Sequence, residues 1–396
     1  MLNPRLATLP EYPFDRLRQL LADVAPPDGV EEIVLSIGEP RHPPPEFVTE
    51  VMAQHKDTWG RYPPIDGSKE FRDAVGDWLT RRYGLDPAKF DRETQILPVV
   101  GTREALYLVS ALVVPEEKGG GRPIVAMPNP FYHVYGGAAA VAGSEPLFLS
   151  ATAENRFIPD VSELDARTLD RLAVFYLCSP ANPQGMAADR ETLAKAIKAA
   201  RRHDFVLVVD ECYAEIYMDA PPVGALEVAA AMGEGFKNVL VFHSLSKRSS
   251  AAGVRSGFVA GDGELIRAFR RLRNYVGPQM PLPTVAASAA LWREESHVEE
   301  LRALYRANFD TAAQVLGDRF GYFRPDGGFF LWLDVGDGVD ATERLWREAG
   351  LRVLPGAYIA RPDADGDNPG ERYIRLALVN PPEVTREALE RLVKVF

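Results

Sequence analysis

The sequence has few residues that could form disulfides or a metal site. It contains two cysteines and six histidines in 396 residues. Both cysteines, Cys178 and Cys212, lie in or beside apolar runs, which is typical of buried, reduced thiols rather than of a secreted disulfide framework. The histidines are scattered and show no HExxH or related spacing, so we expect no metal centre.

The sequence also lacks long apolar segments and an excess of positive charge. It has no run of 18 apolar residues, and its start, MLNPRLATLPEYPF, has no basic segment followed by an apolar one. Lysine and arginine number 45 against 56 acidic residues, a net charge of −11, which argues against nucleic acid or an anionic membrane as the main partner. We expect a cytoplasmic protein with no nucleic-acid and no membrane partner.

The chain is too long for a single hydrophobic core. Short apolar runs alternate with helical patterns in its middle part, and seven runs read as strands: 95–100, 123–127, 146–150, 173–178, 205–210, 239–243 and 257–261. Their hydrophobicity is continuous rather than alternating, which indicates a sheet covered on both faces. The order strand, helix, strand predicts a mostly parallel α/β sheet.

The last hundred residues show a different pattern. Strands are expected in 327–335, 351–356 and 373–379 among helices, which suits a smaller α+β domain. The proline-rich first forty residues contain one short strand, in IVLSIGEP, and are expected to join that domain. The predicted domains are therefore 45–285 for the large one, and 1–44 with 286–396 for the small one.

Candidate functional residues stand where the predicted strands end, which is where open parallel sheets bind their ligands. Gly101 and Thr102 begin an amphipathic helix whose free N–H groups suit a phosphate, although Thr102 would equally serve as an ordinary N-cap. Asn182 follows the run 173–178, where a turn alone would also explain it. Asp210 ends the run 205–210, and a carboxylate there is costly without a cationic or N–H partner.

The segment SLSKR contains the most informative of these residues. Lys247 lies between Ser246 and Arg248, and Arg255 follows eight residues later. Alone, this pattern is more typical of a solvated loop charge than of a nucleophilic lysine. One cofactor, pyridoxal phosphate, would satisfy all of these groups. Its aldehyde reacts with a lysine amine, its ring nitrogen needs a carboxylate to stay protonated, and its phosphate needs N–H groups, hydroxyls and an arginine.

Taken together and in this order, GTREAL, SPANP, DECYAEIY, SLSKR…AGVRSGF and YIRLAL resemble the motifs of the class I and II aminotransferases over roughly residues 10–390. The resemblance implies the aspartate aminotransferase-like fold (fold type I). In this fold a large domain that binds pyridoxal phosphate contains a mostly parallel seven-stranded sheet between helices, and a smaller α+β domain accompanies it.

The resemblance also implies roles for individual residues. Lys247, Asp210 and Tyr213 are the implied catalytic residues, with Lys247 bonded to pyridoxal 5′-phosphate and Asp210 paired with its ring nitrogen. The implied cofactor-binding residues are Lys247, Gly101, Thr102, Arg103, Tyr132, Asn182, Asp210, Tyr213, Ser244, Ser246, Arg255 and Tyr62. Of these, Asn182 and Tyr213 would bond the 3-oxygen of the ring, and Tyr132 would stack on it.

The implied substrates are an amino acid and a keto acid. Arg375 would bind the α-carboxylate in a bidentate pair, with Gly38 and Asn182 also in contact with the substrate. Tyr62 would reach the phosphate in a partner subunit, which implies a homodimer with shared active sites.

Longer segments, including YPFDRLRQL, LSIGEPRHPPP and PNPFYHVYGGAA, are similar to the bacterial N-succinyl-L,L-diaminopimelate aminotransferases of lysine biosynthesis. This similarity implies N-succinyl-L,L-2,6-diaminopimelate and glutamate/2-oxoglutarate as substrates. Basic residues that could read the distal carboxylates, or simply be solvated, are Arg41, His42, Arg61, Arg103 and Arg248. NPQGM and SSAAGV depart from the usual family pattern, so the substrate remains open.

Three alternatives stay open. One is a class I aminotransferase acting on aspartate, alanine or aromatic amino acids. Another is a lyase or synthase that uses the same cofactor residues, because a fold does not determine a reaction. The least expected is a regulator with an aminotransferase-like domain, which would need an added DNA-binding module.

Overall fold

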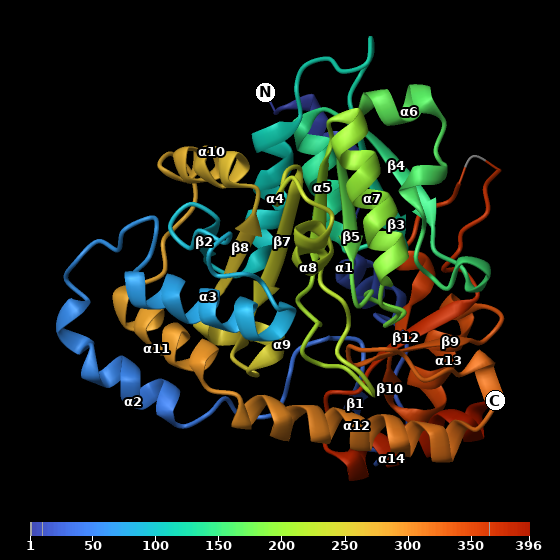
Figure 1. Ribbon diagram of the computed structural model, residues 1–396. Coiled ribbons are helices and arrows are strands. Elements are labelled where there is room, and N and C mark those ends of the chain that lie inside the picture. The colour runs from blue at the N-terminus through green and yellow to red at the C-terminus, as the bar shows by residue number, and fades with distance from the viewer. Residues whose placement is uncertain (1, 10, 364) are drawn as a thin grey trace.

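The computed structural model describes residues 2–9, 11–363 and 365–396, so Met1, Pro10 and Ala364 of the predicted small domain lie outside the described residues. Figure 1 shows the arrangement of the elements. The strands are β1 (Ile33–Val34), β2 (Ile96–Val99), β3 (Ile124–Asn129), β4 (Glu145–Ser150), β5 (Leu172–Cys178), β6 (Val206–Asp210), β7 (Val239–Ser244), β8 (Gly257–Gly261), β9 (Phe330–Asp334), β10 (Leu351–Arg352), β11 (Leu354–Pro355) and β12 (Tyr373–Ala377).

Helices connect these strands. The α-helices are α1 (Pro13–Leu20), α2 (Phe47–Gln54), α3 (Lys69–Tyr83), α4 (Thr102–Val113), α5 (His133–Ala142), α6 (Ala166–Arg171), α7 (Arg190–His203), α8 (Ala225–Ala231), α9 (Leu245–Arg248), α10 (Gly263–Arg273), α11 (Leu282–Arg293), α12 (Ser296–Leu316), α13 (Gly338–Ala349) and α14 (Pro382–Val395). Short 3₁₀ turns are η1 (Pro4–Thr8), η2 (Lys56–Thr58), η3 (Ala153–Asn155), η4 (Val161–Glu163), η5 (Ala252–Val254), η6 (Arg319–Gly321) and η7 (Gly356–Tyr358).

The central sheet has seven strands in the order β2-β8-β7-β6-β5-β3-β4. Its strands are the seven predicted runs, with bounds that differ by one or two residues. The strands from β3 to β7 pair in parallel, while β8 is antiparallel to both of its neighbours, β2 and β7. The prediction of a mostly parallel sheet between helices is therefore confirmed, with one antiparallel strand inserted in it.

Both faces of this sheet are buried, as its continuous hydrophobicity predicts. In β5, Val174 and Tyr176 join an apolar cluster with α4, α5 and α10, whereas Phe175 and Leu177 join a cluster with α3, α7, α8 and α11. Successive side chains of a strand point to opposite faces. A strand covered on both sides therefore needs an apolar residue at every position, and charged groups can appear only where the strand ends.

A second group of strands lies beside the central sheet (Figure 1). β9, β11 and β12 form an antiparallel sheet in the order β11-β12-β9, and β1 pairs in parallel with β10. The expected short strand near the N-terminus thus lies against a strand from the C-terminal part of the chain. The long helix α12 runs along the lower side of the view and packs against α14.

The division into 45–285 and 1–44 with 286–396 stays a prediction. α11 spans the proposed boundary and packs against α2 and α3, in the apolar cluster of the central sheet. In the described part of the chain, none of the helices is both long and apolar enough to cross a membrane.

Candidate active site

The carboxyl edge of the central sheet brings together side chains that are far apart in the sequence. Asp210 and Ser244 are the last residues of β6 and β7, and Gly101 precedes α4 just after β2. β8 is antiparallel to its neighbours, so its amino end, preceded by Arg255, lies at the same edge. This edge is where open α/β sheets hold ligands.

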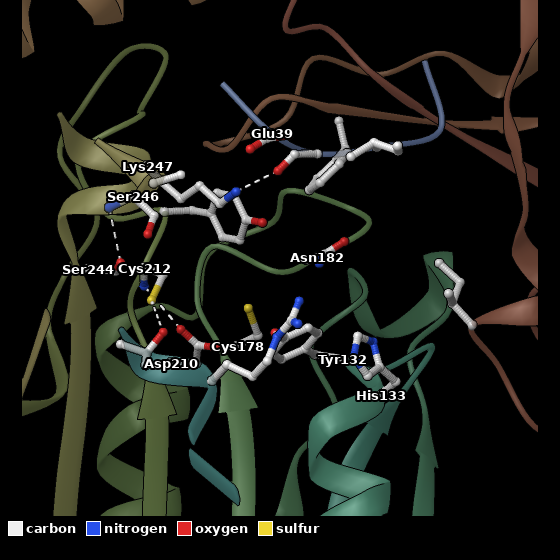
Figure 2. Close-up of a pocket in the computed structure, with 18 of the residues that line it drawn as sticks. Glu39, Tyr132, His133, Cys178, Asn182, Asp210, Cys212, Ser244, Ser246 and Lys247 are labelled. Carbon is white, nitrogen blue, oxygen red and sulfur yellow. Dashed lines mark hydrogen bonds between the residues drawn. The ribbon is translucent and has the colours of Figure 1, made fainter. Parts of the chain in front are cut away.

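A cavity of about 470 Å³ opens at this edge (Figure 2). Most of the predicted site residues line it: Gly38, Thr102, Arg103, Tyr132, Asn182, Asp210, Tyr213, Ser244, Ser246, Lys247, Arg255 and Arg375. Gly101 lies behind Arg255, at the cavity's edge. Tyr62 does not line the cavity and is fully exposed.

Lys247 projects from α9 into the cavity, and its Nζ donates a hydrogen bond to the carbonyl oxygen of Gly38 (Figure 2). Burial lowers the pKa of Lys247 to about 8, and the positive charges of Arg375 and Arg103 contribute to the same direction. Glu39 opposes this shift. The amine is therefore closer to its neutral, nucleophilic form at neutral pH than an ordinary lysine.

Asp210 is buried at the floor of the cavity. Its Oδ2 accepts a hydrogen bond of 2.8 Å from the hydroxyl of Tyr135, and its Oδ1 accepts one of 3.2 Å from the main-chain N–H of Cys212. Burial raises the pKa of Asp210, although both hydrogen bonds oppose that shift. No lysine or arginine of the described residues forms an ion pair with Asp210, so the site has room for a cationic group supplied by a ligand.

The start of α4 and the loop before β8 form a pocket for an anion. Gly101 has φ +71°, and a Cβ there would lie 2.3 Å from Nη2 of Arg255, so only glycine lets the guanidinium approach the helix N-terminus. Arg255 itself has φ +54°, a strained conformation that is common at functional sites. The hydroxyls of Thr102, Ser244 and Ser246 line the same side of the cavity, as phosphate binding at a helix N-terminus requires.

Arg375 reaches the cavity from β12, in the smaller sheet. Its Nη1 donates to Oδ1 of Asn182 at 3.1 Å and its Nη2 to the carbonyl of Ser36 at 2.7 Å. Its Nε is buried and has no hydrogen-bond partner among the described residues. Burial lowers the pKa of Arg375 to about 10, so the guanidinium stays charged at neutral pH and can bind a carboxylate.

Several residues in or beside the cavity have no role that the sequence indicates. Tyr135 lies under Asp210 and stacks on Tyr176, with ring centroids 4.6 Å apart. His133 lines the cavity beside Tyr132, and burial lowers its pKa to about 4, so its ring is neutral at pH 7. The sequence of the segment PNPFYHVY does not indicate which of its aromatic residues reaches Asp210 at the end of β6. The thiol of Cys212 also lies in the cavity, 3.2 Å from Oγ1 of Thr102.

Of the five basic residues considered for the distal end of a substrate, only Arg103 lines the cavity. Its Nε donates to the hydroxyl of Tyr132 at 2.9 Å. Arg41 instead bonds Oδ1 of Asn380 at 2.7 Å. His42 and Arg61 do not line the cavity either.

Arg248 is neither a ligand group nor a surface charge, contrary to both expectations for it. Only 2% of its surface is exposed. Its Nη1 donates to the carbonyl of Leu291 at 2.8 Å, and its Nη2 lies 2.8 Å from a carboxylate oxygen of Glu295. The guanidinium also packs over the ring of Trp292. Arg248 therefore anchors the segment that contains Lys247 to the end of α11.

Comparisons with known proteins agree with this geometry. Residues 30–395 match the family model described as aminotransferase class I and II. The chain is 32% identical over 402 residues to an LL-diaminopimelate aminotransferase of Desulforudis audaxviator (strain MP104C), covering 98% of this chain and 96% of the relative. A 4-dedimethylamino-4-oxo-anhydrotetracycline transaminase of Streptomyces rimosus is 32% identical over 390 residues, which cover 97% of this chain and 99% of the relative. The crystal structure of an aminotransferase from Neisseria meningitidis Z2491 superposes with a TM-score of 0.94 at 38% identity, over 100% of both chains.

The first prediction concerns Arg248. Arg248→Gln should lower the free energy of unfolding by about 1–3 kcal/mol, because it leaves the buried carbonyl of Leu291 without its charged donor. Urea denaturation measures this loss. Arg81→Gln is the matched control, since Arg81 also faces Glu295, at 3.6 Å, but is half exposed. It should cost less than about 1 kcal/mol. Equal losses in the two variants would contradict the structural role of Arg248.

The second prediction concerns Lys247. The rate at which the cofactor-free protein bonds pyridoxal phosphate should rise with pH and level off above about 8, because only the neutral amine attacks an aldehyde and the pKa of Lys247 is about 8. Stopped-flow absorbance gives this rate. An unshifted lysine would keep accelerating up to about pH 10.4. Lys247→Ala, the control, should show no covalent absorption band at any pH.

Proposed function

The chain belongs to the aminotransferase class I and II family, and we propose that it transfers an amino group between N-succinyl-L,L-2,6-diaminopimelate and 2-oxoglutarate, with glutamate as the other amino acid. Members of this family use pyridoxal 5′-phosphate and act on amino acids and keto acids. One observation supports the proposal most: Lys247, Asp210 and Arg375 converge on a single cavity, each with a shifted pKa or an open hydrogen-bonding position.

The residues present fit pyridoxal phosphate. Asp210 is a buried carboxylate with a raised pKa. A protonated ring nitrogen would be the cationic partner that no lysine or arginine of the described residues provides. Gly101 leaves space for Arg255 beside the N-terminus of α4, where a phosphate would be bound by N–H groups, hydroxyls and a guanidinium. Lys247 is a partly desolvated amine that lies across the cavity from Asp210 (Figure 2).

The cofactor, when bound, supplies a protonated ring that accepts electrons from the substrate's α-carbon. Asp210 keeps the ring nitrogen protonated, and Tyr135 holds the carboxylate in place. Arg375 binds the substrate α-carboxylate through its free donors, while its bond to Asn182 fixes its orientation. Lys247 Nζ would take the proton from the substrate's α-carbon as a general base and, as a general acid, would pass that proton to the cofactor rather than back to the α-carbon.

The distal end of the substrate needs groups that Lys247, Arg255 and Arg375 do not provide. Arg103 is exposed to the cavity and lies next to Tyr132, so it can bind a distal carboxylate. Glu39 also lines the cavity, and its carboxylate would suit a distal ammonium. The position of Glu39 and the similarity to the LL-diaminopimelate aminotransferase of Desulforudis audaxviator favour free L,L-diaminopimelate as a second candidate substrate.

The third prediction tests these substrates. Purified holoprotein should be converted from its aldehyde to its amine form by glutamate and by N-succinyl-L,L-diaminopimelate, while aspartate and aromatic amino acids should react at least about 10-fold more slowly. The change in cofactor absorbance measures the conversion. Faster conversion by free L,L-diaminopimelate would select the second candidate. Faster conversion by aspartate or aromatic amino acids would overturn the proposed function. Lys247→Ala, as the control, should convert with none of them.

We also propose a homodimer in which Tyr62 contributes to the phosphate site of the partner. Tyr62 is fully exposed, and Trp59 and Tyr275 are exposed aromatic residues as well. Large exposed aromatic side chains are typical of surfaces that become covered in an assembly.

The fourth prediction follows from this dimer. Sedimentation should give twice the mass of the chain, and Tyr62→Phe should weaken cofactor affinity about 10-fold or more, because a hydrogen bond to a charged phosphate is lost. Equilibrium dialysis measures that affinity. Tyr275→Phe is a control that keeps the exposed aromatic ring and should leave the affinity unchanged. A fully active monomer would refute this arrangement.

A further inference from the structure

A second cavity, of about 250 Å³, lies directly beside the first. Tyr12, Phe131, His133 and Ile359 line both cavities, so the two cavities share one wall. His133 lies on the far side of the first cavity from Lys247 (Figure 2). A substrate that extends from Lys247 toward His133 therefore extends toward the second cavity.

The wall of the second cavity is mostly apolar. Leu9, Pro13, Val134 and the rings of Tyr107 and Tyr358 line it. An aliphatic chain would be favoured in such a space because it would leave water for apolar contacts.

One cation faces this apolar space. Arg361 lines the second cavity, is half-buried and packs its guanidinium 5.5 Å from the ring centre of Phe131. Its main chain is held by Asn129, through hydrogen bonds of 2.9 Å and 2.7 Å. No carboxylate in the described ranges forms an ion pair with Arg361. Glu11 also lines the cavity, but it is exposed and accepts a hydrogen bond from Gln19.

We propose that the second cavity is a subsite for the far end of a long amino-acid substrate, with a chain of methylene groups along the apolar wall and a terminal carboxylate on Arg361. The inference rests on the proposed function, which places the α-amino group at Lys247 and the α-carboxylate at Arg375. A succinyl group on the distal nitrogen of diaminopimelate has this chemistry, since it is two methylene groups ending in a carboxylate. Free diaminopimelate has no such extension.

Straight-chain dicarboxylates test the subsite without any turnover. Isothermal titration calorimetry of the holoprotein should show affinity that increases from glutarate to sebacate. Arg361→Gln should weaken sebacate binding about 10- to 100-fold, because a charge-assisted pair is lost, and should leave glutarate binding unchanged. Arg18→Gln is the matched control, since Arg18 is an exposed arginine of α1 that pairs with Asp15, and it should alter neither affinity.

Gly137 offers an independent variant that fills the space. It lines the second cavity, and a Cβ there would contact only Cδ2 of Leu9, at an ordinary 3.9 Å. Gly137→Leu should therefore fold, since leucine also favours the helix more than glycine does. It should weaken sebacate binding by at least about 10-fold without changing glutarate binding. Gly137→Ala should have a smaller effect in the same direction.

The outcomes separate this inference from the proposed function. If both variants bind long and short dicarboxylates as the unmodified protein does, the subsite is refuted even where diaminopimelate substrates react. Equal losses for glutarate and sebacate would refute it as well, because the variants would then disturb the whole site. If the variants bind only the long dicarboxylates more weakly, and no diaminopimelate compound is converted, the subsite is supported and the proposed substrate is refuted.

Discussion

The burial of Asp210 at the end of β6 is the constraint on which the rest of the site depends. A carboxylate in this position loses its hydration, and the hydroxyl of Tyr135 and the N–H of Cys212 replace only part of it. The pKa of Asp210 is raised because its lost hydration is only partly replaced. A ligand with a positive ring nitrogen compensates for this loss, so the same feature that is unfavourable in the empty protein favours the cofactor. Stacking on Tyr176 supports the ring of Tyr135, whose hydroxyl donates to the Asp210 carboxylate.

The site is completed by residues from two separate apolar cores. Asp210 ends β6 of the central sheet and Lys247 follows β7 on α9, whereas Arg375 comes from β12 of the smaller sheet. Direct hydrogen bonds join the two parts: Lys247 bonds Gly38 of the N-terminal segment, and Arg375 bonds Asn182, which follows β5. A substrate carboxylate on Arg375 and a substrate amine at Lys247 would therefore connect the same two parts of the molecule. Substrate binding and the relative position of the two cores are thus physically linked.

The sequence predicted the central sheet and most of the cavity because both depend on short-range patterns. Continuous apolar runs are characteristic of strands buried on both faces, and the residue after such a run must lie at a sheet edge, as Asp210 and Ser244 do. Arg248 could not be placed in this way, because its burial depends on Leu291 and Glu295, more than forty residues away. The lowered pKa of Lys247 likewise comes from burial, with the charges of Arg375 and Arg103 adding to it. The burial of Arg248 and of Lys247 depends on tertiary packing between distant segments, which a local sequence motif does not indicate.

The groups proposed for the reaction and those proposed for substrate choice lie in different parts of this chain. The groups proposed to contact the cofactor lie at the carboxyl edge of the central sheet, where strand order brings together an anion pocket, a carboxylate and an amine. The groups that can contact the far end of a substrate, such as Tyr12, Arg103 and His133, lie on helix ends and on the N-terminal segment. Two relatives with the same identity to this chain carry names of chemically unlike substrates. Positions at helix ends and in loops can change without disturbing the sheet, so one framework can serve different substrates.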